Sequence, residues 1–285
     1  MKANVSKINA VIVRLSISMF SNQRQDRAIT DDVKMRKALG NGAGKWVKYK
    51  LPDESLKAIR EYATNIRAYH YSLTSPWEDG TRMLSAKARP QYDEKLEQFT
   101  AEYMKLVDEF GKNYPGWIEQ AELMHAGTFD AHDYPEWDTC RATFSIRREY
   151  FPVPKPDHFS QDMKTLYGAG LEAMTSMKID EAVSDTWDRL IKPVQLMAER
   201  LASPDAIFRD TLVANVKEMA ELIPMLNITG DKKMTEAAAA ISASLSSLDV
   251  AVLRENKVQR KAVAEEAAKI VSRFGGIGKR KLANN

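Results

Sequence analysis

The sequence predicts a mainly α-helical protein, a bundle of long helices with a small two-stranded β-element. Through most of the chain, apolar residues recur every three or four positions, which is the spacing of one face of an α-helix. Two short stretches alternate apolar and polar residues instead, and that period is typical of a half-buried strand. Prolines and glycines fall where such helices would begin and end. Together these patterns favour long helices with one small sheet.

Composition places the chain among ordinary globular proteins. Of its 285 residues, 44% are hydrophobic and 28% are charged, so the body of the chain is not expected to be disordered. We expect an N-terminal α+β part over 1–156, a C-terminal helical part over 157–274, and a flexible basic tail over 275–285. The single cysteine, Cys140, excludes an internal disulfide, which implies either a reducing compartment or no structural need for cross-links.

The two expected strands lie far apart in the sequence. Apolar residues occupy the odd-numbered positions of 11–19, and 142–150 alternates more weakly. One strand cannot satisfy its own backbone hydrogen bonds, so we expect these two to pair. Pro152 and the prolines after it then end the second strand, because proline donates no ladder hydrogen bond.

Three helices are expected between these strands. Pro52 begins one and Pro90 the next, and a separate short helix follows Pro115. The apolar stripes of the first two are Leu56, Ile59, Ala63, Ile66, His70 and Leu73, and then Tyr92, Leu96, Phe99, Tyr103, Leu106 and Phe110. A histidine on such a stripe is more often a hydrogen-bonded core residue than a catalyst.

Four more helices are expected in the C-terminal part. One covers 180–201 with a kink at Pro193, and Ser203 begins the next as an N-cap followed by proline and aspartate. The last two cover 232–249 and 257–274. Loops are expected over 40–44, 74–80 and 128–140.

The net charge of +3 conceals a separation of charge along the chain. Residues 1–50 carry 11 Lys and Arg against 3 Asp, and residues 257–285 carry 8 against 2 acidic residues. The body over 51–256 carries 23 basic and 34 acidic residues. The basic ends therefore meet a polyanion or an acidic protein face, or they neutralise the acidic body of this chain or of a neighbouring subunit.

Signatures of catalysis are weak. The stretch 40–45 lacks the first glycine of a phosphate loop, and Trp46 stands where Ser or Thr would reach a metal, so a flexible linker is favoured. Glu122 and His125 have the Glu-x-x-His spacing of a di-iron site in a helical bundle. Such a site needs a second Glu-x-x-His motif, and the sequence contains none. We expect no cofactor and no metal, and a non-enzymatic protein is favoured. A weaker alternative is a metal-dependent enzyme that also uses Asp130, His132, Asp133, Asp138 and Cys140.

Basic and aromatic residues are interleaved after the first strand. This pattern suits single-stranded nucleic acid, because cations meet phosphates while aromatic rings stack on bases. A basic tail adds contacts that are independent of base sequence. The alternative is a solvated surface with Trp46 and Tyr49 in the core. The expected nucleic-acid-binding residues are Arg24, Arg27, Lys45, Trp46, Lys48, Tyr49, Lys50, Lys279, Arg280 and Lys281.

Several segments together carry a resemblance. They are Val11–Ser18, Tyr69–Tyr71 with Pro76–Trp77, Asn113–Pro115, Phe151–Pro154, Ala198–Asp210 and Asn227–Asp231. With these segments the chain resembles a family of uncharacterised proteins from tailed bacteriophages. None of the segments is a catalytic signature, so the resemblance implies a setting in early phage DNA metabolism and no particular chemistry.

The leading hypothesis is a non-enzymatic phage protein that binds single-stranded nucleic acid as a homo-oligomer. The alternative is an interaction factor that binds a host or phage protein through its acidic helical body. No membrane partner is expected: the apolar stretch 8–20 is too short to span a bilayer and lacks the features of a signal peptide. We therefore expect a cytoplasmic location, in the host cell if the protein is phage-encoded.

Overall fold

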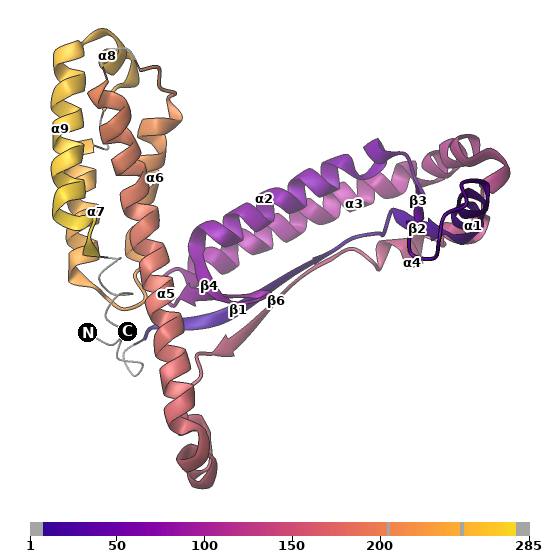
Figure 1. The fold of residues 1–285 in the computed structure, drawn as a ribbon, viewed down its shortest axis with the longest axis horizontal. Helices are drawn as coiled ribbons and strands as arrows, with labels where there is room; N and C mark the ends of the chain where they lie inside the picture. The colour runs from indigo at the N-terminus through magenta and orange to yellow at the C-terminus, as the bar shows by residue number, and fades with distance from the viewer. Residues whose placement is uncertain (1–7, 204–205, 246–247, 278–285) are drawn as a thin grey trace. The chain divides into compact units, whose positions relative to one another are not determined.

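The computed structural model describes residues 8–203, 206–245 and 248–277, and in them the chain is mainly helical, with long helices and two antiparallel sheets. The elements follow one another along the chain as Figure 1 labels them. None of the helices in these ranges combines the length and apolarity needed to cross a bilayer. The prediction of a mainly helical protein is confirmed, but it underestimates the β-structure.

The larger sheet has four strands, in the order β4-β5-β1-β6. The strands are β1 (Ala10–Ser18), β4 (Thr74–Glu78), β5 (Thr81–Ser85) and β6 (Ser145–Pro152). The predicted pairing of the first strand with the stretch near residue 150 is confirmed, since β1 and β6 are neighbours. On its other side β1 pairs with β5, in the register Val11 opposite Leu84.

The expectation of a polar loop over 74–80 is wrong, because these residues form β4 and the turn into β5. Thr74 is fully buried, and its hydroxyl donates to the carbonyl of His70 at 2.6 Å, so a polar residue fits the interior. Pro76 is tolerated because β4 is an edge strand. Gly80 has a φ of 74°, the left-handed conformation that this turn requires.

A second sheet has two strands, β2 (Gln23–Asp26) and β3 (Trp46–Tyr49), with helix α1 (Arg27–Arg36) between them in the chain. Helix α1 begins at its N-cap Asp26, whose carboxylate accepts a hydrogen bond from the amide of Ile29 at 2.9 Å. The only buried residue of α1 is Thr30, whose hydroxyl accepts from the amide of Trp46 at 2.9 Å. One hydroxyl thus ties α1 to β3.

Helices α2 (Lys57–Leu73) and α3 (Arg89–His125) match the first two predicted stripes. The short 3-10 turn η2 (Asp53–Leu56) precedes α2, and the stripe from Leu56 to Leu73 is buried. The break expected at Pro115 is absent, and α3 runs through it for 37 residues. Proline there removes one hydrogen bond to the preceding turn, and one lost bond does not end a long, packed helix.

The chain continues through short turns, η3 (Ala126–Thr128) and η4 (Ala131–Asp133), to helix α4 (Trp137–Arg141). After η5 (Pro156–His158), helix α5 (Gln161–Ala202) begins about twenty residues earlier than predicted and continues through Pro193. The expected helix start at Ser203 is wrong: residues 206–209 are not helical, and α6 (Thr211–Leu226) begins after them. Residues 204–205 lie outside the described ranges.

The remaining helices are α7 (Lys232–Leu245), α8 (Val250–Glu255) and α9 (Lys257–Phe274). The predicted range 257–274 is confirmed to the residue. The range predicted as 232–249 ends earlier, at Leu245, and the short helix α8 was not predicted.

The contacts divide the chain into two units. Unit 1 comprises the described residues of 1–14, 70–93 and 149–285, and unit 2 comprises 15–69 and 94–148. In unit 1, helices α5, α6, α7 and α9 pack against one another (Figure 1), and their buried apolar residues, Trp187 among them, form one core. In unit 2, the ring of Phe110 lies 5.8 Å from that of Phe144 and 6.0 Å from that of Trp137. The division near residue 156 that the sequence suggests stays a prediction.

Candidate nucleic-acid interface

Two of the predicted phosphate ligands face each other across the small sheet. Arg24 of β2 is the cross-strand partner of Lys48 of β3. Two cations in this position repel each other unless an anion lies between them. Asp133 of η4 supplies it: one carboxylate oxygen lies 2.9 Å from Lys48 Nζ, and the other oxygen accepts from Arg24. Asp130 adds a second carboxylate, 3.3 Å from Arg24.

This ion cluster is partly closed to water. The side chains of Asp133 and Lys48 are 2% and 8% exposed, whereas that of Arg24 is 49% exposed. Burial alone would raise the pKa of Asp133, but Arg24 and Lys48 outweigh it and hold the pKa below its ordinary value. Asp133 is therefore an anion at neutral pH. The charges of Arg24 and Lys48 are compensated within the protein, so both residues first of all fix β2 and β3 to the 128–133 segment.

The aromatic residues of β3 are exposed, not buried in the core. Trp46 is 51% exposed, Val47 47% and Tyr49 48%. Successive residues of a strand point to opposite faces, so Trp46 shares a face with Lys48 while Val47 and Tyr49 lie on the other face. The carbonyl of Tyr49 accepts a hydrogen bond from His125 Nε2 at 2.7 Å. The sheet therefore presents one exposed aromatic ring on each side.

Several cations of this region have no carboxylate partner in the described part of the chain: Arg27, Lys34, Lys37 and Lys45. Arg36, in contrast, pairs with Asp32 at 2.8 Å. Lys50 is half-buried, with its Nζ 4.5 Å from the centre of the Phe20 ring, and burial lowers its pKa. The predicted tail residues Lys279, Arg280 and Lys281 lie outside the described residues.

A groove of about 760 Å³ lies beside β2, the first turn of α1 and the segment 127–130. Arg24, Arg27 and Lys48 line it together with Asp26 and Asp130. The first turn of a helix favours anions, because its amides lack intrahelical acceptors. The carboxylate of Asp26 already accepts a hydrogen bond from this turn. The groove therefore has mixed charge, and Arg27 gives it one positive charge in excess.

The residues weighed as metal ligands are engaged elsewhere or lie apart. His125 donates to Tyr49, and His132 Nδ1 lies 2.9 Å from Asp130. In the ranges that the structure describes, no three His, Cys, Asp or Glu side chains are placed to hold one metal ion. Cys140 is buried, and burial raises the pKa of its thiol, which disfavours the reactive thiolate. Glu122 and Asp138 stay surface residues.

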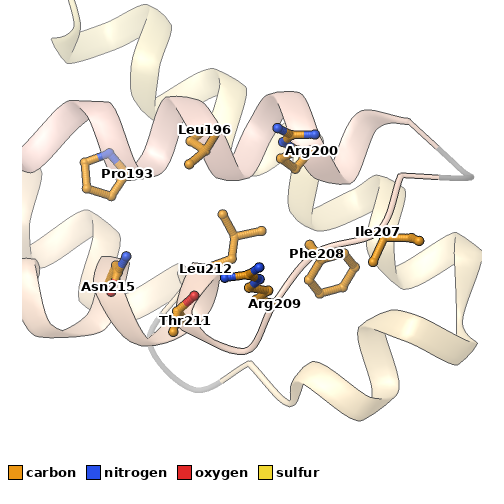
Figure 2. Close-up of a pocket in the computed structure, with 9 residues that line it drawn as sticks. All are labelled: Pro193, Leu196, Arg200, Ile207, Phe208, Arg209, Thr211, Leu212 and Asn215. Carbon is orange, nitrogen blue, oxygen red and sulfur yellow. The ribbon is translucent and has the colours of Figure 1, made fainter.

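A second hollow, which sequence reasoning did not find, lies between α5 and α6 (Figure 2). Its volume is about 290 Å³, and Leu196, Phe208 and Leu212 give it an apolar lining. Figure 2 also shows Arg200 from α5 and Arg209 from the segment that precedes α6. Neither arginine has an ion pair in the described residues. The hollow could therefore accept an apolar group that carries a negative charge.

The segment that lines this hollow is fixed by Arg260 of α9. One guanidinium nitrogen of Arg260 donates to the carbonyls of Arg200, Ser203 and Ala206, at 3.1, 2.6 and 2.6 Å. The guanidinium also lies 5.1 Å from the centre of the Phe208 ring. Arg260 is only 6% exposed, so its hydrogen bonds stabilise this segment from inside the protein.

Comparison with known proteins adds no name to these sites: no protein-family model, curated protein or solved structure matches this chain.

Proposed function

We propose that this protein binds nucleic acid, in particular single strands, through the β2–β3 surface. We define this surface as Arg27, Lys34, Lys37, Lys45, Trp46, Val47 and Tyr49. The observation that carries the proposal is the combination of two exposed aromatic rings with cations that no described carboxylate neutralises. Both rings are about half exposed, so each is accessible to stack on a base.

Single strands fit this surface better than a duplex does. An unpaired base offers its flat face to an aromatic ring, and each such stack contributes about 1–3 kcal/mol. Trp46 and Tyr49 lie on opposite faces of the sheet, so each ring serves a different segment of nucleic acid or binds alone. Arg27 and Lys45 supply the phosphate contacts, which carry most of the affinity at low salt.

The ion cluster has a supporting part in this proposal. Arg24 and Lys48 fix β2 and β3 to the 128–133 segment through Asp133. The exposed part of the Arg24 side chain also lines the groove beside α1. The cellular setting is proposed from the resemblance to tailed-phage proteins: a non-enzymatic protein of phage DNA metabolism in the host cytoplasm.

The test is fluorescence anisotropy with a labelled single-stranded oligonucleotide and its duplex, at 50 and 200 mM salt. We expect binding at low salt, a preference for the single strand, and an affinity that falls steeply with salt. Trp46→Ala should weaken binding about tenfold, as expected for the loss of one stacked base. Lys112→Ala, which removes an exposed cation of α3, is the matched control and should have little effect. No binding of wild type at 50 mM salt would refute the proposal.

A second candidate function is that of an interaction factor for a host or phage protein. The observation that favours it is the α5–α6 hollow, whose apolar lining and two uncompensated arginines fit an acidic, apolar peptide segment. The test compares the capture of one identified partner by wild type, by the chain truncated after residue 277, and by the variant Arg200→Glu, Arg209→Glu. Capture that survives truncation and is lost in the double variant supports this function, and equal capture by all three contradicts it.

A further inference from the structure

The N-terminal half of α5, residues 161–178, is covered on one face only. Gly168 and Thr175, seven residues apart, lie on the covered face. Thr175 is fully buried, and its hydroxyl donates to the carbonyl of Pro154 at 3.3 Å. A Cβ atom placed on Gly168 would lie 3.6 Å from Pro156 Cβ, so the chain before α5 packs closely against this face.

The opposite face of the same segment is apolar and exposed. Leu166 is 72% exposed, Tyr167 58%, Met177 48% and Met163 42%. We call this face the α5 stripe and define it as Met163, Leu166, Tyr167, Gly170, Ala173 and Met177. Apart from the adjacent pair Leu166 and Tyr167, its members follow one another at intervals of three and four residues, which is the spacing of the contact positions in a coiled coil. No described residue covers the stripe.

The stripe is large enough for a specific interface. Single exposed apolar residues are ordinary, but a continuous row over four helical turns marks a contact surface. The exposed fractions of its large side chains correspond to roughly 450 Å² in each copy, and the polar residues beside them add more. Two such faces in contact bury about 1,000 Å² or more, which is where stable protein interfaces begin.

We propose that the occupant of the α5 stripe is the α5 stripe of a second copy of this chain, with the two helices antiparallel. The order of large and small residues along the stripe favours this arrangement. In an antiparallel pair with a two-fold axis, Leu166 faces Gly170 of the partner subunit and Met163 faces Ala173 of the partner subunit. Leu166 and Met163, two of the large side chains of the stripe, then each meet a small one, an arrangement that fills a helix interface without gaps.

The distribution of charge on and beside the stripe is compatible with contact between two identical faces. The stripe contains no charged residue, so it has no means of selecting a nucleic acid or an acidic partner. The nearby lysines are compensated within the chain: Lys178 pairs with Glu181 at 3.1 Å, and Lys164 pairs with Asp157. Pairing through the stripe joins two copies whether or not either binds nucleic acid, so this inference stands apart from the proposed function.

The test is the molar mass in solution, measured by light scattering after size exclusion over a range of micromolar concentrations. Wild type should be a dimer, and Leu166→Glu should be a monomer with an unchanged circular dichroism spectrum. Leu123→Glu is the matched control: Leu123 is 83% exposed on α3 and is not a member of the stripe, so this variant should stay dimeric. A monomeric wild type, or a dimeric Leu166→Glu variant, overturns the proposal.

Oxidative cross-linking tests the orientation in a Cys140→Ala background, which removes the native thiol. The pair Leu166→Cys and Gly170→Cys should form disulfides between two chains, because the antiparallel arrangement places these positions opposite each other. Ala173→Cys alone should form none. Efficient cross-linking through Ala173→Cys alone would show a parallel pair and contradict the antiparallel arrangement.

Discussion

The buried histidine of unit 1 makes the stability of the protein depend on pH in a predictable way. His70 is 5% exposed, and its Nδ1 lies 2.7 Å from the hydroxyl of Tyr92. Burial, with a smaller effect from the positive charge of Arg82, lowers the pKa of His70 from 6.5 to about 4. The folded protein therefore keeps His70 neutral where the unfolded chain would protonate it.

The sign and the size follow from proton linkage. Between pH 6.5 and pH 4 the unfolded state binds one proton more at this residue, so the free energy of unfolding rises with pH. The contribution is complete above the unfolded pKa of 6.5 and is lost as pH falls toward 4. One pKa unit corresponds to about 1.4 kcal/mol, so the whole contribution is about 3 kcal/mol.

The assay is urea denaturation of wild type and His70→Gln at pH 7.5 and at pH 4.5. Wild type should lose about 2–3 kcal/mol more than the variant between these pH values, because glutamine does not titrate in this range. The control is Tyr92→Phe, which removes the hydrogen bond but keeps the buried histidine, and which should retain the pH dependence. If wild type and His70→Gln lose the same stability on acidification, the assignment of a buried, neutral His70 is wrong.

Two further predictions concern unit 2. Asp133→Asn should destabilise the protein by about 3–5 kcal/mol, because it leaves the Lys48 ammonium buried without an anion, and adding Lys48→Met should restore most of the loss in urea denaturation. An undiminished loss in the double variant would contradict this account. Gly111→Ala should cost about 1–3 kcal/mol, since a Cβ there would lie 2.2 Å from the Trp137 ring, whereas Gly116→Ala on the same helix meets nothing within 4 Å and should stabilise it slightly. Equal effects of the two alanines would refute the close approach of that ring.

The helices could be predicted where their apolar residues face a core. The stripe of α2, which includes Ile59 and Ile66, follows directly from its period, and the bounds of α9 were predicted to the residue. The first half of α5 was missed because its apolar stripe faces water and its buried face carries Gly168 and Thr175 instead. A pattern search for a single buried apolar face does not recognise such a helix.

The candidate site could be predicted in part. The basic and aromatic stretch was visible in the sequence, and the structure places Trp46 and Tyr49 at the surface. The sequence could not show that Arg24 and Lys48 are compensated by Asp133, because that carboxylate lies 109 residues from Arg24 in the chain and reaches it only through folding. Strand β4 was missed for a similar reason, since the burial of Thr74 depends on a hydrogen bond made in the folded state.

The central claim is that single-stranded nucleic acid lies against the β2–β3 surface. The most direct measurement is ultraviolet cross-linking of an oligothymidine to the protein, followed by mass-spectrometric mapping of the modified peptides. The proposal predicts cross-links on the peptides that carry Trp46 or Tyr49, and their loss in the Trp46→Ala, Tyr49→Ala variant. Cross-links confined to other parts of the chain, or unchanged in that variant, would contradict it.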